Sequence, residues 1–301
     1  MGKTSELTEA LWQEAKQFFH RMPENQVGSD VALRPDLAGL VLYEEPIFGV
    51  ADAADPLFAE LKREEAIGPQ WLSPVEWLPS AQTVVTYFLP FTQEVKDSNR
   101  QNPSVASSQW QHARIEGEEL NQLFRRHLAG WLREQGYESL VPGDDPRFRV
   151  WEPMRSNWSE RHAAYVAGLG TFGMSRGLIT ARGIAGRFGS VITAAPLSVT
   201  ARPYRELYEY CSRCGACAAR CPAHAILPGP DLNQCKSNSV CGAFLQPPKD
   251  LSAAGGDTRP PEDQGEPYPA KRKIRYGCGK CQVGVPCESR IPANRKSSED
   301  M

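Results

Sequence analysis

The sequence predicts an α+β protein in which two segments of opposite chemistry follow one another. All 9 cysteines lie at or after position 211, and all 7 tryptophans lie at or before position 158. The 301 residues are enough for one large domain or two ordinary ones. We therefore expect an α/β domain over residues 1–200, a cysteine-rich domain over 201–292 and a tail over 293–301. An insert rich in Pro, Gly and Asp, residues 246–270, interrupts the second domain.

Hydrophobic patterning predicts the elements of the first part. Residues 5–22 carry apolar side chains at helical spacing, which predicts an amphipathic helix. Residues 83–89 (TVVTYFL) are β-branched and aromatic and stop at a proline, as a buried strand does. Shorter apolar pieces predict a strand at 40–43 and a helix at 56–65.

The middle of the chain predicts one long helix followed by a glycine-dense segment. Residues 104–135 keep one apolar face and end at Gly136, and Gly is the usual residue just past a helix. Shorter patterns predict strands at 137–141 and 148–151, a helix at 159–167, and strands at 178–180 and 190–193.

The charge balance excludes several classes of protein. With 34 basic and 36 acidic residues the formal net charge is −2, which argues against a nucleic-acid coat protein or a polybasic membrane binder. No run approaches the ~18 apolar residues that a membrane helix needs, and the N-terminus has no apolar signal core. We therefore expect a cytoplasmic protein with no membrane partner.

The first cysteine group has the spacing of an iron-sulfur protein. Cys211, Cys214, Cys217 and Cys221, followed by Pro222, form the pattern C-x2-C-x2-C-x3-C-P. This run binds [4Fe–4S] clusters in bacterial ferredoxins, where three thiolates bind one cluster and the fourth binds another. The alternative, a zinc ribbon, would separate its two CxxC pairs by ~15–20 residues.

A second cluster requires thiolates from the later cysteines, of which Cys278 and Cys281 form a CxxC pair. Cys287 follows without a tight spacing, so a buried free cysteine is the alternative there. By the logic of two-cluster ferredoxins, cluster one takes Cys211, Cys214, Cys217 and Cys287, and cluster two takes Cys221, Cys278, Cys281 and either Cys235 or Cys241.

These motifs give the chain a resemblance to a known family, the epoxyqueuosine reductases, and more remotely to the corrinoid reductive dehalogenases. The similar segments are 165–173 (YVAGLGTFG), 186–193 (GRFGSVIT), 232–235 (LNQC) and 276–282 (YGCGKCQ), together with the first cysteine group. The resemblance implies a nitroreductase-like α/β sandwich, which is the cobalamin-type domain, followed by a two-cluster ferredoxin-like domain. It also makes Cys235, rather than Cys241, the ligand of cluster two. The helical repeats that follow in the family have no counterpart in this sequence.

The resemblance further implies a base-off cobalamin held against the glycine-rich segment and reduced by the nearer cluster. Glycine lacks a side chain, so the backbone there can approach a flat macrocycle closely. One alternative is a tight turn with no ligand. Another is a dinucleotide site, although GxGxxG here follows a predicted helix where that fingerprint requires a strand. The expected cofactor-binding residues are Gly168, Leu169, Gly170, Gly173, Gly189 and Ser190.

The proton donor departs from the family pattern, because the family's catalytic aspartate falls on Met154 or Arg155. The candidate catalytic residues lie on the predicted helix that follows: Glu160, His162 and Tyr165. His162 and Tyr165 are three residues apart and would share a helix face. A purely structural role is the alternative for each.

These expectations combine into an iron-sulfur oxidoreductase that depends on cobalamin and carries out a reductive deoxygenation or elimination. Its partners would be a reduced ferredoxin or flavodoxin-type electron donor and a small-molecule or modified-nucleoside substrate. The basic run 271–275 could contact tRNA phosphates, or it could be a solvated rim. The alternative function is an electron-transfer protein or reductive activator that has no substrate of its own.

Overall fold

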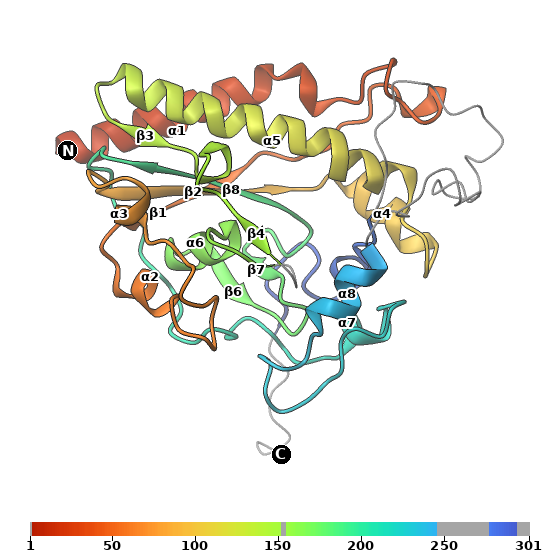
Figure 1. Ribbon diagram of the computed structural model, residues 1–301. Helices are drawn as coiled ribbons and strands as arrows, with labels where there is room; N and C mark the ends of the chain where they lie inside the picture. The colour runs from red at the N-terminus through yellow and green to blue at the C-terminus, as the bar shows by residue number, and fades with distance from the viewer. Residues whose placement is uncertain (1, 152–154, 246–276, 294–301) are drawn as a thin grey trace.

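The computed structural model describes residues 2–151, 155–245 and 277–293, and it contains a mixed α/β arrangement around an antiparallel sheet (Figure 1). The sheet has the order β1–β2–β8–β3, with bounds Ile47–Asp52, Thr83–Pro90, Gly186–Thr193 and Ser139–Leu140. Two hairpins lie outside it: β4 (Val150–Trp151) with β5 (Arg155–Ser156), and β6 (Gly170–Phe172) with β7 (Leu178–Thr180). Met154, the insert 246–270, the basic run 271–275 and the tail from 294 onward lie outside the described residues.

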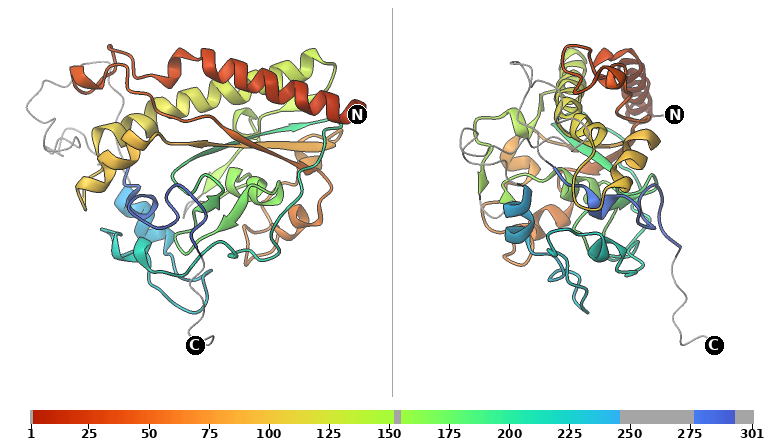
Figure 2. Two further views of the ribbon diagram at one scale, coloured as in Figure 1. Left: turned by 180° about the vertical axis from the view of Figure 1, so that it is seen from behind. Right: turned by 90° about the vertical axis from the view of Figure 1, so that its right-hand side faces the viewer.

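Strand β2 is buried along its whole length because helices cover both faces of the sheet. Tyr87 and Leu89 point to a core shared with α1 (Lys3–Arg21) and α5 (Ser108–Glu134). Val84 points the other way, to a core that contains α6 (Glu160–Val166) and several tryptophans. Figures 1 and 2 show α1 and α5 running together over one face of the sheet while α6 lies beneath the other. Because successive side chains of a strand point to opposite faces of the sheet, β2 contributes residues to two separate cores.

The remaining helices are short, and several of them accompany the cysteines. Asp55 caps α2 and the Thr92 side chain caps α4, each by accepting a backbone N–H of the first turn. Near the cysteines, Figure 1 places α7 and α8 beside each other below the end of α4. The bounds are α2, Pro56–Glu60; α3, Pro74–Trp77; α4, Gln93–Gln101; α7, Ala216–Ala219; and α8, Asn238–Leu245.

The long helix and the buried central strand are confirmed, whereas two shorter expectations are wrong. Residues 40–43 form isolated bridges, because Val41 pairs with Gln26 while Tyr43 pairs with Phe91, so no continuous ladder develops. The helix expected at 56–65 ends at Glu60. Strands β1 and β6 and helix α4 were not expected from the patterning. Within the described residues, no helix combines the length and apolar character needed to cross a bilayer.

The last described segment, residues 277–293, returns to the first part of the chain. Val283 is fully buried in the core that α5 shares with the sheet. The backbone N–H of Ile184, just before β8, donates to the carbonyl of Cys287 at 2.9 Å. The cysteines of this segment are therefore built onto the α/β layer, and the division at residue 200 remains a prediction.

Phe124 on α5 gives a test of this packing. Its ring is fully buried and meets Tyr87 edge-on with centroids 4.8 Å apart, so Phe124→Ala leaves a cavity in the main core. We expect a loss of about 3–5 kcal/mol in the free energy of unfolding, seen as a lower Tm in near-UV circular dichroism. The neighbouring Leu123 is 38% exposed, and Leu123→Ala should cost less than ~1 kcal/mol. Equal losses for the two variants would contradict the orientation of α5.

Candidate functional site

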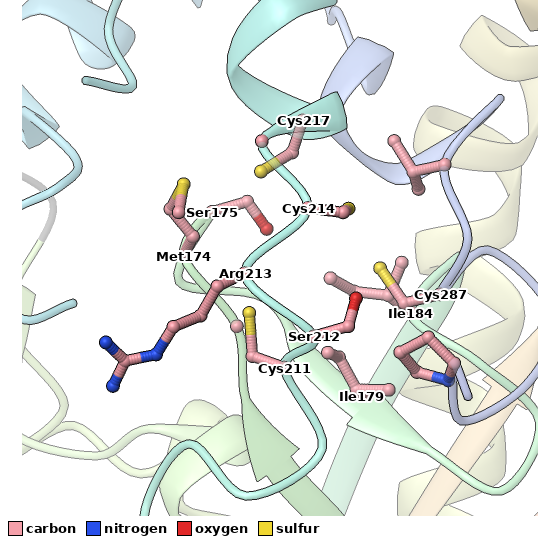
Figure 3. A pocket seen from close by; sticks show the side chains of 14 residues that line it. Met174, Ser175, Ile179, Ile184, Cys211, Ser212, Arg213, Cys214, Cys217 and Cys287 are labelled. Carbon is pink, nitrogen blue, oxygen red and sulfur yellow. The ribbon is translucent and has the colours of Figure 1, made fainter. Parts of the chain in front are cut away.

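The first cysteine group and the returning segment meet around one small pocket (Figure 3). Gly215 adopts a left-handed conformation (φ 74°), which turns the chain into α7 and keeps the three loop cysteines on one short arc. The opposite wall is apolar, with Ile179, Ile184 and Val285. The cysteines that line this pocket are Cys211, Cys214, Cys217 and Cys287, the four assigned to cluster one.

Burial disfavours ionisation of the thiols that line this pocket. It raises the pKa of Cys217 and of Cys287 to about 12, and neighbouring thiolates add to each shift. Iron binds the thiolate, so cluster assembly must displace protons and is favoured as pH rises. Among the described residues, no three His, Cys, Asp or Glu side chains meet closely enough to share one metal ion. Cluster ligands bind different irons and need not meet at one point.

The second cysteine set lines a much larger cavity of about 620 Å³. Cys221, Cys278 and Cys281 form part of its wall, and the Sγ of Cys221 accepts the backbone N–H of Ala225 at 3.3 Å. A thiolate at Cys281 also raises the pKa of Cys217, so the two sets lie close together. The arrangement brings both predicted cysteine sets to adjacent sites.

Two cysteines, Cys235 and Cys241, are candidates for the fourth ligand of the second set. Cys241, on α8, lines the large cavity beside Cys221 and Cys281. Cys235 does not line it and is 3% exposed, with its Sγ donating to the carbonyl of Asp231 at 3.4 Å. The small apolar cluster around Cys235 nevertheless packs against Cys221 and Cys281. The sulfur of Cys235 is thus shielded from water, whereas Cys241 opens to the cavity.

The wall of the large cavity away from the cysteines carries a network of charged side chains, of which Arg125 is buried and Glu118, Glu160 and Arg187 are half-buried. Arg125 on α5 donates to Glu160 Oε1 at 3.2 Å and to Glu118 Oε1 at 3.0 Å. Arg187 on β8 donates to the other oxygen of Glu118 at 2.6 Å. Ser190 donates its hydroxyl to Glu160 Oε2 and accepts the indole N–H of Trp158 at 2.9 Å. The network fixes the Glu160 carboxyl at the cavity wall.

Glu160 is the only one of the three predicted catalytic residues that lines this cavity. Burial raises the pKa of its carboxyl, and the Arg125 guanidinium partly opposes that shift. A carboxyl with a raised pKa holds its proton more tightly at neutral pH and can donate it. The site therefore places a potential acid on the first turn of α6.

His162 and Tyr165 do not line the cavity. His162 bonds to the Ser159 hydroxyl through Nδ1 at 2.8 Å and packs on Phe172, and burial lowers its pKa to about 3. It is therefore neutral at pH 7. Tyr165 is 8% exposed and stacks on Tyr204, and burial raises its pKa. Their catalytic roles remain predictions.

Other parts of the chain occupy the space beside the glycines of the glycine-rich segment. A Cβ on Gly170 would lie 2.0 Å from the carbonyl oxygen of Ile179, because β6 pairs closely with β7. Gly168 has φ +84° and faces the carbonyl of Ala201, while a Cβ on Gly189 would meet the Tyr87 hydroxyl at 2.2 Å. None of the expected cofactor-binding residues lines the large cavity, neither Gly168, Leu169, Gly170 and Gly173 nor Gly189 and Ser190. Gly173 lines the small pocket of the first cysteine set, and Leu169 belongs to the core under the sheet. Their contact with a cofactor remains a prediction.

The sequence reading missed the polar face of α5. Arg114, Glu118, Gln122 and Arg125 all line the cavity, at steps of three or four residues along one face of the helix. The spacing was visible in the sequence. A polar stripe on a long helix is normally read as solvent-facing, and here the cysteine segments cover it.

Lys280 is the second charged group that the sequence reading passed over. Its side chain is fully buried between Cys278 and Cys281, and Nζ donates to both Asn99 oxygens at 2.9 Å. Burial lowers the pKa of this ammonium to about 8.

Comparisons with known proteins connect these features. Residues 207–227 match the family model described as a 4Fe-4S binding domain. No curated protein sequence matches the chain. Among solved structures, an epoxyqueuosine reductase from Bacillus subtilis, with its catalytic aspartate loop swung out of the active site, has a TM-score of 0.51 and 18% identity. That alignment covers 96% of this chain and 69% of that chain.

A selenomethionine-labelled epoxyqueuosine reductase gives a TM-score of 0.52 at 18% identity, again over 96% of this chain and 69% of that chain. A catabolic reductive dehalogenase gives a TM-score of 0.42 at 18% identity, over 61% of this chain and 24% of that chain. The resemblance to epoxyqueuosine reductases that the motifs predict is confirmed at the level of the fold. The 4Fe-4S binding segment is confirmed as well.

The two remaining cysteines give a matched test of the predicted second cluster. We expect Cys235→Ser to lose that cluster, because a serine oxygen is a poorer ligand for cluster iron than a shielded thiolate. Cys241→Ser should keep both clusters. Iron content and EPR after anaerobic reconstitution measure the difference. The reverse pattern would assign the ligand to the thiol on the cavity wall.

Proposed function

We propose that this chain is an iron-sulfur reductase with two [4Fe–4S] clusters and a cobalamin in the large cavity. Its α/β part would then be the nitroreductase-like cobalamin domain, and residues 201–292 the ferredoxin-like domain. The carrying observation is that the second cysteine set and Glu160 line the same cavity. An electron relay and a proton donor would thereby meet at one substrate.

The residues around the cavity suit cobalamin. Its volume, about 620 Å³, would take part of the corrin ring rather than the whole cofactor, and Trp110, Phe148 and Trp158 give it aromatic walls. Among the described residues, the buried Arg187 Nε and Gln282 Oε1 have no hydrogen-bond partner although both residues line the cavity. A corrin carries amide side chains that both donate and accept hydrogen bonds, and these would satisfy one donor and one acceptor.

The cysteine sets suggest the direction of electron flow. Cys214 of the first set is exposed, whereas the second set faces the cavity. A reduced ferredoxin or flavodoxin-type donor would therefore reach cluster one, and cluster two would serve the cavity. When bound, cobalamin supplies a strongly reducing cobalt centre next to the substrate.

Glu160 would supply a proton to the reaction. Deoxygenation of an epoxide consumes two electrons and two protons and releases an alkene and water. The clusters would relay both electrons from the external donor, and Glu160 Oε2, which accepts the Ser190 hydroxyl, would give one proton to the departing oxygen. The second proton comes from solvent. Arg125, paired with Glu160, then balances the carboxylate that remains.

The substrate class is a small molecule or a modified nucleoside, and we place the protein in the cytoplasm. A pure electron-transfer protein has no need for a cavity lined by a half-buried network of carboxyl and guanidinium groups. That network favours an enzyme over the alternative of a reductive activator.

The cofactor prediction uses a variant that fills the cavity. Wild-type protein should carry about eight iron and eight sulfide per chain after anaerobic reconstitution, since two four-iron clusters are proposed. It should also bind cobalamin with the EPR signal of base-off Co(II). Gln122 lines the cavity from α5, so Gln122→Trp should weaken cobalamin binding at least tenfold with iron unchanged. Leu123→Trp, on the exposed side, is the control. Fully loaded wild type that ignores cobalamin would favour the electron-transfer function.

The proton donor can be identified by turnover. With reduced holoenzyme and an epoxyqueuosine-bearing stem-loop or a small epoxide as probe, Glu160→Gln should lower kcat by about 10²–10⁴. Tyr165→Phe should change kcat less than threefold, because Tyr165 lies away from the cavity. A large loss in Tyr165→Phe with an unaffected Glu160→Gln would transfer the role to the tyrosine.

A further inference from the structure

Lys280 occupies an unusual electrostatic position. Its side chain is fully buried, and Nζ donates to the backbone oxygen and to the Oδ1 of Asn99, each at 2.9 Å. Both acceptors are neutral amide oxygens. The ion pairs found among the described residues do not include Lys280. A buried ammonium with neutral partners alone carries an uncompensated charge, which is costly.

The surroundings hold Lys280 in this position. Asn99 donates its side-chain amide to the carbonyl of Cys278 at 2.9 Å and accepts the backbone N–H of Ser107 at 3.1 Å. Gly279, at φ +68°, presses on the ring of Trp110, where a Cβ would collide. The lysine therefore cannot move out to solvent without breaking the loop that carries Cys278 and Cys281.

The negative charge that would compensate the ammonium would come from the second cluster, whose proposed ligands flank the lysine in sequence. Cys278 and Cys281 are proposed ligands of the second cluster, and a [4Fe–4S] cluster with four thiolates carries a net negative charge that grows when it accepts an electron. A fixed positive charge beside a cluster stabilises the reduced state more than the oxidised state. It therefore raises the reduction potential.

We propose that Lys280 is the buried charge partner of the second cluster and sets its reduction potential above that of the first. This inference rests on the proposed function. The first cluster has a different environment, with Met174, Ile179, Ile184 and Val285 around it. Arg213, the cation of that pocket, is exposed at the surface and donates to the Pro230 carbonyl. Electrons delivered at the surface would then move downhill toward the cavity.

The test is an EPR-monitored redox titration of the reconstituted full-length protein. In Lys280→Gln the side chain can still donate to Asn99 but has no charge. We expect the potential of one cluster to fall while the other stays unchanged, with iron still about eight per chain. Lys280→Met, which removes the hydrogen bonds as well, should shift the same cluster in the same direction. Arg213→Gln is the matched control and should leave the second cluster unchanged.

The outcomes separate the two proposals. Unchanged potentials in Lys280→Gln at full iron would overturn the role of Lys280 while leaving the two clusters intact. Wild-type protein with about four irons would overturn the proposed function itself. If both neutral variants lose the second cluster, Lys280→Arg decides. Retention of eight irons there supports charge pairing, and loss overturns it.

Discussion

The return of residues 277–293 to helix α4 is the constraint on which both cysteine sets depend. Asn99 ties down the loop of Cys278, and Arg100 pairs with the buried Glu288, one residue beyond Cys287. Glu288 also accepts the backbone N–H of Gly284. One short helix thus fixes the last cysteines of both sets, and a shift of this segment would open both sites together.

How much the sequence predicts depends on whether the interaction is local. The loop from Cys211 to Cys221 could be read directly, because a cluster places its ligands on one short stretch of chain. The position of Cys287 followed from ferredoxin logic, and it does line the first pocket. Strand β2 was equally readable, since a strand buried on both faces needs apolar residues throughout.

The cavity could not be read in this way, because it forms where distant segments meet. In the sequence, Arg125 has the pattern of a solvent-facing helix residue. In the structure, α6 and the cysteine segments cover it. Gly170 shows the opposite error. The backbone of β7 occupies the space that a side chain at Gly170 would need, so no room for a cofactor is left there. A glycine-rich motif alone therefore does not tell whether a ligand or the chain's own backbone lies against it. Local sequence patterns predict helices and strands, whereas the segments that cover them are known only from the tertiary fold.

The division of each cysteine set between a local loop and the returning segment has a consequence for biogenesis. Cys211, Cys214, Cys217 and Cys221 leave the ribosome well before Cys278 and Cys287. Neither of the two proposed clusters could be completed on the nascent chain until that late stretch has emerged and docked on α4. Each proposed cluster would then act as a crosslink between parts of the chain that are far apart in sequence, which would remove conformational freedom from the unfolded chain. Completion of the proposed clusters would therefore be a late step of maturation. Iron starvation would leave residues 277–293 held only by their protein contacts with α4, with the core around Val283 and with Ile184.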